Sequence, residues 1–478
     1  MVASGFKLSE KFQIPVLLRP GIRICHARQA VNLPRPKKAD QQAEFVRNPG
    51  RWAATPRFRY VLHKELNDKL RKIARLNEKS PFNRLSFKLE GDYPLGVLAA
   101  GAPAAALADI LADAGLSEKT PVLTLGAPYP FPEGLVNNFL SRCRQVLVLE
   151  ETDLFIELLA PKREKLLGRL SGHVPGEGEL TPEVINEVFR RSQKSAGQKP
   201  IKPLAGRSYA KILGELKLPI MKPRLCAGCG HRPAFYAIRQ AFPKAIFPSD
   251  IGCYTLGLNL RAVDTVLDMG SGITLASGLY QALKRDGPDE DAPVIVATIG
   301  DSTFFHSGTA SLVNAVYNDA RFVLVVLDNQ TTAMTGMQPT PDLGIRADGL
   351  EGKRVDMERL IRGCGVDHVV KVAAYDIPAV IAAVKEAHEQ ASKPDGGPAV
   401  VIAAHPCRIA YPDEHPRLPV VVNDECDGCG ICTALFECPA MSVPVKGEKV
   451  RIDPKLCVEC GVCVHVCPNG ALEVADAS

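Results

Sequence analysis

Two blocks of closely spaced cysteines lie in the last sixth of this 478-residue chain. The first block contains Cys426, Cys429, Cys432 and Cys438, and the second contains Cys457, Cys460, Cys463 and Cys467. A proline follows each block, and only the longer gap before Cys438 departs from the bacterial C-x2-C-x2-C-x3-C-P run. Such runs hold iron–sulfur clusters, so the chemistry that these residues indicate is one-electron transfer.

In runs of this kind the fourth cysteine of each block ligates the cluster of the other block. We therefore expect two [4Fe-4S] clusters with crossed ligand sets. One set is Cys426, Cys429, Cys432 and Cys467, and the other is Cys457, Cys460, Cys463 and Cys438. A zinc site is the alternative, because paired C-x-x-C motifs also bind zinc. Zinc takes two pairs of ligands, so the duplicated triplets favour iron–sulfur clusters.

Polar residues follow two apolar segments in the middle of the chain. Residues 294–300 (VIVATIG) lead into Asp301 and Ser302, and residues 322–328 (FVLVVLD) lead into Asn329. Parallel strands place ligands beyond their carboxyl ends, so Asp301 and Asn329 are expected to converge on one ion. Carboxylate, amide and carbonyl oxygens suit Mg²⁺ bound together with a diphosphate.

The local sequence around Asp301 supports an anion site. Gly300 lets the backbone approach a ligand closely, and a helix that begins after Ser302 would point amide groups at anionic oxygen. Helix capping is the alternative explanation for a lone Gly-Asp pair. A dinucleotide site is not supported, because no G-x-G-x-x-G motif follows a strand here.

The Gly-Asp-Ser motif with its downstream Asn resembles the thiamine diphosphate motif. Residues 225–232 (LCAGCGHR), 250–254 (DIGCY) and 327–338 (LDNQTTAMTGMQ) resemble the thiamine-diphosphate-dependent 2-oxoacid:ferredoxin oxidoreductase family, in particular the α subunits of its indolepyruvate branch. The resemblance covers nearly the whole chain and includes the long first cysteine block. It implies a thiamine diphosphate and Mg²⁺ site.

Individual residues take roles from that resemblance. The Mg²⁺ ligands would be Asp301, Asn329 and the carbonyl of Thr331. Near the diphosphate would lie His231, Gly252, Ser271, Gly300 and Ser302. A third [4Fe-4S] cluster beside the thiamine would be ligated by Cys226, Cys229, Cys253 and Cys407. For these four cysteines a free C-x-x-C pair and buried apolar cysteines remain alternatives.

The resemblance also implies an activity. We expect oxidative decarboxylation of arylpyruvates of the indolepyruvate and phenylpyruvate type to acyl-coenzyme A, with electrons passed through the clusters to ferredoxin. Residues 332–336 (TAMTG) favour the arylpyruvate branch. The partner would be the small β subunit of a hetero-oligomer. Two alternatives stay open: a non-catalytic electron-transfer subunit, and the same chemistry on another 2-oxoacid.

The catalytic glutamate of such enzymes would come from a pyrimidine-binding domain, most of which we expect to be missing through truncation or a split gene. We therefore name no catalytic residue. Residues 6–12 and 60–76 are expected to be helical, and residues 14–20 and 398–404 are expected to form strands. The fold class expected is α/β multidomain. Its expected parts are a remnant of the pyrimidine-binding domain (1–33), connectors (34–90 and 166–203), a transketolase-C-terminal-like α/β domain (91–165), a thiamine-binding doubly wound parallel sheet (204–412) and an α+β ferredoxin-like domain with two clusters (416–478).

Composition narrows the class of protein. The chain is 46% hydrophobic and 23% charged, and it contains no apolar run of membrane-spanning length and no secretory signal pattern. Its 15 cysteines, an odd number in metal-like spacings, favour a reducing cytoplasm. The formal net charge of +5 is spread along the chain, so we expect no nucleic-acid partner.

Overall fold

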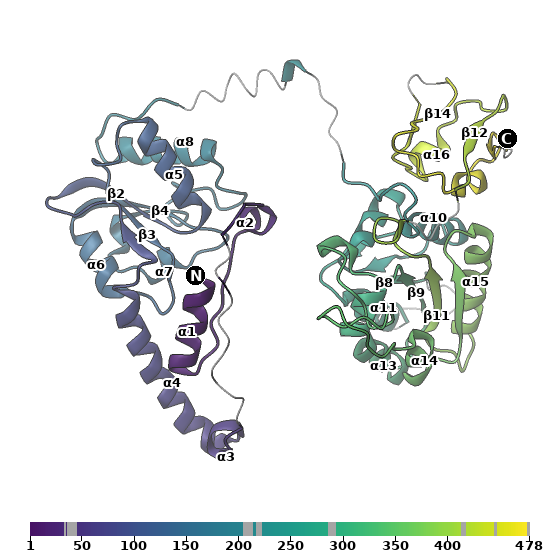
Figure 1. Ribbon diagram of the computed structural model, residues 1–478, viewed down its shortest axis with the longest axis horizontal. Helices are drawn as coiled ribbons and strands as arrows, with labels where there is room; N and C mark the ends of the chain where they lie inside the picture. The colour runs from purple at the N-terminus through teal and green to yellow at the C-terminus, as the bar shows by residue number, and fades with distance from the viewer. Residues whose placement is uncertain are drawn as a thin grey trace. The chain divides into compact units, whose positions relative to one another are not determined.

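The computed structural model describes residues 1–32, 35, 45–203, 214–216, 222–284, 293–412, 417–443 and 447–475. The chain divides into two compact units, Met1–Pro219 and Ile220–Ser478 (Figure 1). The expected domain starts at positions 204 and 416 lie outside the described residues, as does most of the first part of the 34–90 connector. Within the described residues, we find no helix with the length and apolar character that a bilayer span requires.

A five-stranded sheet in the order β1-β3-β2-β4-β5 forms the centre of the first unit (Figure 1). The strands are β1 (Asn83–Leu85), β2 (Tyr93–Ala99), β3 (Val122–Leu125), β4 (Cys143–Leu149) and β5 (Leu166–Leu167). Strands β2 to β5 are parallel, whereas β1 pairs antiparallel with β3. Continuous apolar runs, such as the buried residues 146–149, suit strands that are covered on both faces.

Helices cover both faces of this sheet. Two separate clusters of buried residues join α5 (Ala102–Asp113) and α8 (Pro182–Ser195) to one face and α6 (Glu133–Ser141) to the other. Helix α8 lies within residues 166–203, which the sequence suggested as a connector. Its Ile185, Val188 and Phe189 are buried, as expected for an amphipathic helix. The surrounding Gly, Pro and Lys residues hide this periodicity in the sequence.

The N-terminal part of this unit is mainly helical. Its helices are α1 (Val2–Phe12), α2 (Ile22–His26), α3 (Pro49–Trp52) and α4 (Pro56–Asn77). Farther along the chain, the short helix α7 (Ile156–Leu159) follows β4. The helix expected near residue 6 is present as α1, and the expected helical stretch at 60–76 lies within α4. Residues 14–20, for which the sequence predicts a strand, have none. A strand needs a neighbour for its backbone hydrogen bonds, and no pairing of this segment is found among the described residues.

The second unit contains a parallel sheet in the order β10-β11-β9-β8. The strands are β8 (Val296–Gly300), β9 (Val323–Asp328), β10 (Val369–Ala373) and β11 (Ala399–Ala404). Alternate residues enter opposite cores, so Val325 faces one buried cluster and Val326 the other. The sequence predicts β8, β9 and β11 but not β10, because β10 lies at the sheet edge and only its first residue is buried.

Helices lie on both faces of this sheet as well. One core includes α10 (His231–Ala241) and α15 (Ile377–Ala391), and the other includes α11 (Ser271–Lys284), α13 (Thr309–Tyr317) and α14 (Met357–Gly363) (Figure 1). The shorter elements are β6 (Pro248–Ser249), the 3-10 helix η2 (Cys253–Leu260), β7 (Thr265–Val266), α12 (Asp301–Thr303), the π-helix η4 (Phe304–Gly308) and η5 (Ala333–Thr335).

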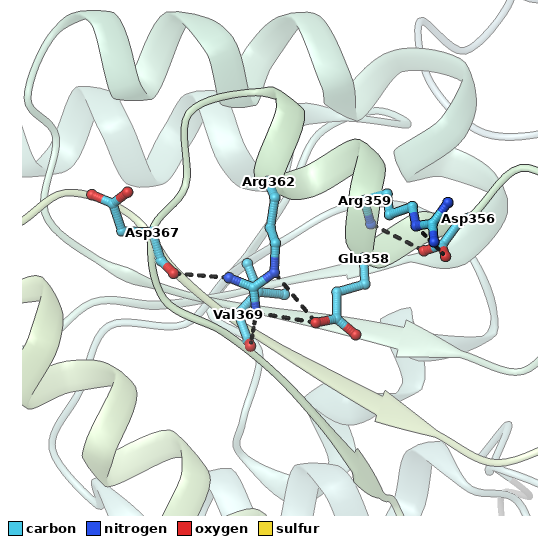
Figure 2. Close-up of polar contacts among 6 residues, drawn as sticks. All are labelled: Asp356, Glu358, Arg359, Arg362, Asp367 and Val369. Carbon is cyan, nitrogen blue, oxygen red and sulfur yellow. Dashed lines mark hydrogen bonds and ion pairs between the residues drawn. The ribbon is translucent and has the colours of Figure 1, made fainter.

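Polar contacts fasten α14 to the strand that follows it (Figure 2). Arg362 donates to the backbone carbonyls of Asp367 (3.0 Å) and Val369 (2.8 Å) and also to the carboxylate of Glu358 (3.0 Å). Asp356 caps the helix by accepting a hydrogen bond from the backbone amide of Arg359 at 3.0 Å. These contacts fix where β10 begins at the sheet edge.

The cysteine-rich tail has little regular structure. Two antiparallel pairs join β12 (Val420–Val422) to β15 (Leu472–Val474) and β13 (Met441–Ser442) to β14 (Arg451–Ile452). The helical turns α16 (Ile431–Ala434) and η7 (Val462–His465) each lie within one cysteine block. The tail therefore depends on loops, and these bring the two blocks together.

Candidate functional site

The ends of β8 and β9 form the centre of the site. Gly300 pairs with Leu327 in the sheet register, so the residues that follow each strand meet at one edge. The Asp301 carboxylate accepts hydrogen bonds from the backbone amides of Ser302 (2.7 Å) and Asn329 (3.2 Å). Asp301 and Asn329 are both buried. The structure thus brings together the two residues that the sequence placed on one ion.

His231 lies against the same strand end. It begins α10 and is buried, and its Nε2 lies 3.3 Å from the Asn329 Nδ2. Burial lowers the pKa of His231 to about 4, so the ring is neutral at neutral pH. A neutral ring can accept a hydrogen bond from the Asn329 amide. The Oδ1 of Asn329 accepts from the Thr331 backbone amide at 3.2 Å.

Three carboxylates gather at this edge. Oxygen atoms of Asp301, Asp328 and Asp342 all lie within 4.8 Å of one another. Burial, and next the charge of Asp328, raises the pKa of Asp301 well above its ordinary value. Burial also raises the pKa of Asp328, although Lys371 lies 3.2 Å away and opposes the shift. A hard divalent cation would neutralise this oxygen cluster, so the donor set fits Mg²⁺.

Two of these carboxylates were not assigned from the sequence. Asp328 is the last residue of β9, and only its position beside Asn329 could have indicated it. Asp342 lies in an irregular loop, where no motif marks it. Its proximity to Asp301 results from folding of the 331–342 segment back over the strand ends.

The glycines of the site have a local explanation. A Cβ atom added to Gly252 or Gly300 would clash with the ring of Tyr254, whose hydroxyl lies 3.0 Å from the Thr303 Oγ1. The two glycines therefore accommodate a buried tyrosine between two loops. Close approach to a diphosphate is an additional role that this packing neither requires nor prevents.

Two serines of the predicted site lie at helix starts. Ser302 is buried within α12, and its Oγ accepts a hydrogen bond from the Thr332 Oγ1 at 2.8 Å. Ser271 begins α11, and its Oγ donates to the backbone carbonyl of Asp268 at 3.0 Å. The Ser302 contact ties the segment after β9 to the segment after β8. Both predicted serines are therefore already engaged in local hydrogen bonds.

Four cysteines expected to share a cluster lie beside this site. Burial, with the nearby thiols of Cys226 and Cys407, raises the pKa of the Cys253 thiol to about 11. Burial, again with Cys226 and Cys253 among the causes, raises the pKa of Cys229 to about 12. Mutual influence of this kind requires proximity. The four thiols, which come from three separate segments, therefore lie in one neighbourhood, and we refer to them as the first thiol group.

A direct backbone contact joins the cysteine group to the strand-end site. The amide of Cys407 donates to the carbonyl of Asn329 at 3.0 Å, and the amide of His405 donates to the carbonyl of Asp328 at 2.9 Å. Segment 405–407 therefore continues the pairing of β11 with β9 past the end of both strands. It places a cysteine one hydrogen bond away from the candidate metal site.

The tail cysteines fall into two groups. One cavity is lined by Cys426, Cys429, Cys432 and Cys467. Another is lined by Cys438, Cys457, Cys460 and Cys463. Backbone amides point at two sulfur atoms, from Val450 to Cys426 (3.5 Å) and from Ala471 to Cys467 (3.3 Å). Cavities that are lined by cysteines in this way fit [4Fe-4S] clusters, and the amide donors to Cys426 and Cys467 are of the kind that tune cluster sulfurs.

Comparisons with known proteins match these regions. Residues 250–403 match the family described as thiamine pyrophosphate enzyme, C-terminal TPP binding domain. Residues 450–473 match the family described as 4Fe-4S binding domain. The solved structure of 2-oxoglutarate:ferredoxin oxidoreductase from Magnetococcus marinus covers 47% of this chain and 78% of its own at 18% identity, with a TM-score of 0.32. That likeness is too slight to support a conclusion.

Two curated relatives are much more similar. Indolepyruvate oxidoreductase subunit IorA of Archaeoglobus fulgidus is 38% identical over 99% of this chain and 74% of its own length. The subunit of the same name from Thermococcus kodakarensis is 36% identical over 99% of this chain and 75% of its own length. With identity of this level sustained over almost all of this chain and most of theirs, the chain belongs to the family of indolepyruvate oxidoreductase IorA subunits, thiamine-dependent 2-oxoacid oxidoreductases with [4Fe-4S] electron transfer.

Proposed function

We propose that this chain is the cofactor-bearing subunit of an oxidoreductase that decarboxylates arylpyruvates to acyl-coenzyme A and passes the electrons to ferredoxin. One observation carries the proposal. The buried oxygen site at the ends of β8 and β9 is joined to a group of four thiols by the 3.0 Å hydrogen bond from the Cys407 amide to the Asn329 carbonyl. A site for cofactor chemistry and the start of an electron path would therefore be adjacent.

The oxygen site would hold Mg²⁺ and the diphosphate of thiamine diphosphate. The metal donors would be Asp301, Asn329 and the Thr331 carbonyl, and Asp328 and Asp342 add negative charge nearby. When bound, the thiamine would supply the carbon nucleophile and the electron sink for decarboxylation.

The chain's own residues would hold and shape that site. Asn329 is oriented by contacts on both ends of its amide, with His231 and with Thr331. Pre-set orientation of this kind lowers the cost of ordering a metal site. Burial keeps the His231 ring neutral, so the ring would add no positive charge next to a bound cation.

The cysteines would carry electrons out of the site. We propose three [4Fe-4S] clusters: one on Cys226, Cys229, Cys253 and Cys407, and two on the crossed tail sets. The reducing conditions that such thiols need support a cytoplasmic location. The small β subunit would complete the hetero-oligomer, as the subunit designation of the relatives suggests.

Two finer structural assignments belong to the same proposal. The sheet of β1 to β5 and its helices would correspond to a transketolase-C-terminal-like domain, which the parallel α/β architecture supports. Residues 1–33 would belong to a pyrimidine-binding domain. The other proposed boundaries are those expected from the sequence, except that α8 adds part of 166–203 to the first sheet.

The substrate assignment is tested by 2-oxoacid-dependent dye reduction. The chain would be assayed under anaerobic conditions with coenzyme A, with and without its small subunit, on indolepyruvate, phenylpyruvate, pyruvate and 2-oxoglutarate. We expect dye reduction to be fastest with indolepyruvate and phenylpyruvate, which are oxidised, in the complete complex. Faster turnover of pyruvate would reassign the substrate. A chain that is fully loaded with clusters and thiamine, yet gives no reduction with any 2-oxoacid in the complex, would favour a non-catalytic electron-transfer subunit.

A further inference from the structure

Arg232 occupies an unusual position in α10. Its side chain is only 2% exposed, although arginine is rarely buried to this extent. The guanidinium donates to the backbone carbonyls of Phe436 (2.9 Å) and Cys226 (3.3 Å), and it also donates to those of Glu437 and Leu225. These acceptors lie on two segments that are about two hundred positions apart in the sequence.

Both segments belong to cysteine groups. Leu225 and Cys226 open the C-x-x-C pair beside the oxygen site, and Phe436 and Glu437 immediately precede Cys438. Arg232 also lines the cavity that is bounded by the tail set Cys438, Cys457, Cys460 and Cys463, and Cys229 lines it too. The side chain therefore spans the boundary between the first thiol group and one of the tail sets.

Arg408 makes a second bridge of the same kind. It follows Cys407 in the first thiol group, and its Nη2 donates to the carbonyl of Val458, the residue after Cys457, at 2.8 Å. Gly228 also packs against this segment. A Cβ atom at Gly228 would lie 2.6 Å from the Val458 Cγ2, so a larger residue there would push against the Val458 side chain.

The other tail set has different surroundings. The cavity of Cys426, Cys429, Cys432 and Cys467 is lined by tail residues alone. Of the two tail sets, the Cys438 set is thus the one that touches the first thiol group.

We propose that Arg232 and Arg408 are positioning residues at an electron-transfer junction. They hold the cluster of Cys438, Cys457, Cys460 and Cys463, here the junction cluster, against the first cluster, which is the one on Cys226, Cys229, Cys253 and Cys407. The junction cluster is then the first tail cluster to receive electrons. The junction rests on the proposed function, because it needs clusters at both sites. In each transfer one electron leaves the first cluster, which is oxidised, and enters the tail cluster, which is reduced. The two guanidinium charges favour the reduced cluster, which carries one more negative charge.

The order of the clusters can be tested in the full chain, purified anaerobically and reduced chemically. Magnetic coupling between reduced clusters would be recorded by electron paramagnetic resonance. Cys429→Ala removes the tail cluster that also uses Cys426, Cys432 and Cys467. In this variant the magnetic coupling between the first cluster and the junction cluster should remain. In Cys460→Ala, which lacks the junction cluster, that coupling should disappear. The opposite pattern would overturn the proposal.

The two arginines can be tested by redox titration of Arg232→Met, Arg232→Lys and Arg408→Met. Both Met variants should shift the midpoint potential of the junction cluster to more negative values and weaken its coupling to the first cluster. The Lys variant should restore much of the potential but not the coupling, because lysine keeps the charge and loses the fork of donors. Arg239→Met removes one charge from the same helix α10 and should change neither readout.

Unchanged potentials and coupling in both Met variants, at full iron content, would overturn the proposal. If Arg232→Met fails to fold, the half-buried Arg408→Met decides the outcome. A wild-type chain without a first cluster would also overturn it. The titration uses no 2-oxoacid, so a chain with the expected coupling but no 2-oxoacid-dependent activity would refute the proposed decarboxylation, while the proposed clusters and the junction between them would stand.

Discussion

The oxygen site and the cysteine tail reach their ligand arrangements in opposite ways. At the ends of β8 and β9, imidazole and carboxylate groups are gathered from segments far apart in the chain, such as His231, Asp301 and Asp342. In the tail, each group takes three of its four thiols from one short block. A rigid parallel sheet positions the first site, whereas short loops position the second.

This difference decides what each region can tolerate. The oxygen site places like charges together in a buried position, which is costly unless a cation is bound. The tail encloses its thiols in two cavities with few strands around them. We therefore expect a single substitution at the oxygen site to abolish cofactor binding without unfolding the chain. A single substitution in a tail group should remove the whole cluster of that group.

The largest expected effect is on cofactor binding. Asp301→Ala should weaken Mg²⁺-dependent thiamine diphosphate binding by about 100-fold or more, because it removes the central carboxylate of the site. Calorimetric titration of the full chain would measure the affinity. The visible spectra of the tail clusters should not change, since their cavities contain no residue of this site.

Asp348 provides a matched control for this substitution. It is exposed and paired with Arg346, so Asp348→Ala should leave thiamine affinity within experimental error. If Asp301→Ala bound thiamine diphosphate with wild-type affinity, the strand-end carboxylates would have no part in cofactor binding. The contrast between the oxygen site and the cysteine tail would then lose its basis.

The next effect concerns the crossed ligand sets in the tail. Cys438→Ala should remove the cluster that also uses Cys457, Cys460 and Cys463, which lowers the iron content by about four atoms per chain. The cluster on Cys426, Cys429, Cys432 and Cys467 should remain, although Cys438 belongs to the same sequence block as the first three of these cysteines. If Cys438→Ala removed that cluster instead, each sequence block would hold its own cluster.

A smaller effect is expected at the edge of the oxygen site. Asp342→Asn should weaken Mg²⁺ binding by about tenfold, because it removes one charge near the metal but no direct ligand that we assign. The measurement is the Mg²⁺ concentration that half-saturates thiamine binding. A loss as large as that of Asp301→Ala would make Asp342 a direct ligand.

The smallest effect tests the scaffold. Arg362→Met should destabilise the second unit by about 1–2 kcal/mol, because two backbone carbonyls lose their donor (Figure 2). Arg359→Met is the control, since the Arg359 side chain is 88% exposed. Chemical denaturation would give both values. Equal stabilities of the two variants would show that the tether between α14 and β10 contributes nothing measurable.

The predictability of the two sites from sequence follows from the same contrast. Cysteine spacing predicts the two tail groups because three thiols of each lie within one short block. The Asp301 and Asn329 pair was also predictable, because both follow apolar strand segments. Asp328 and Asp342 were not assigned, since their convergence depends on how a loop folds back over the sheet.

The fold shows a similar division. Strands with continuous apolar runs, such as β8 and β9, were predicted, as their buried faces require such residues. The edge strand β10 and helix α8 were missed, because only the first residue of β10 is buried and the apolar residues of α8 are spaced among polar ones in a segment that resembles a loop. Arg232 gave no signal at all, since its role depends on carbonyl groups that only the folded chain brings together.

The central claim is that a thiol group able to hold a third cluster adjoins the cofactor site. Iron and sulfide content of the anaerobically purified chain, compared with that of Cys253→Ala, tests it most directly. We predict about twelve iron atoms in the wild-type chain and about eight in the variant, since three cubanes become two. About eight iron atoms in both proteins would contradict the account.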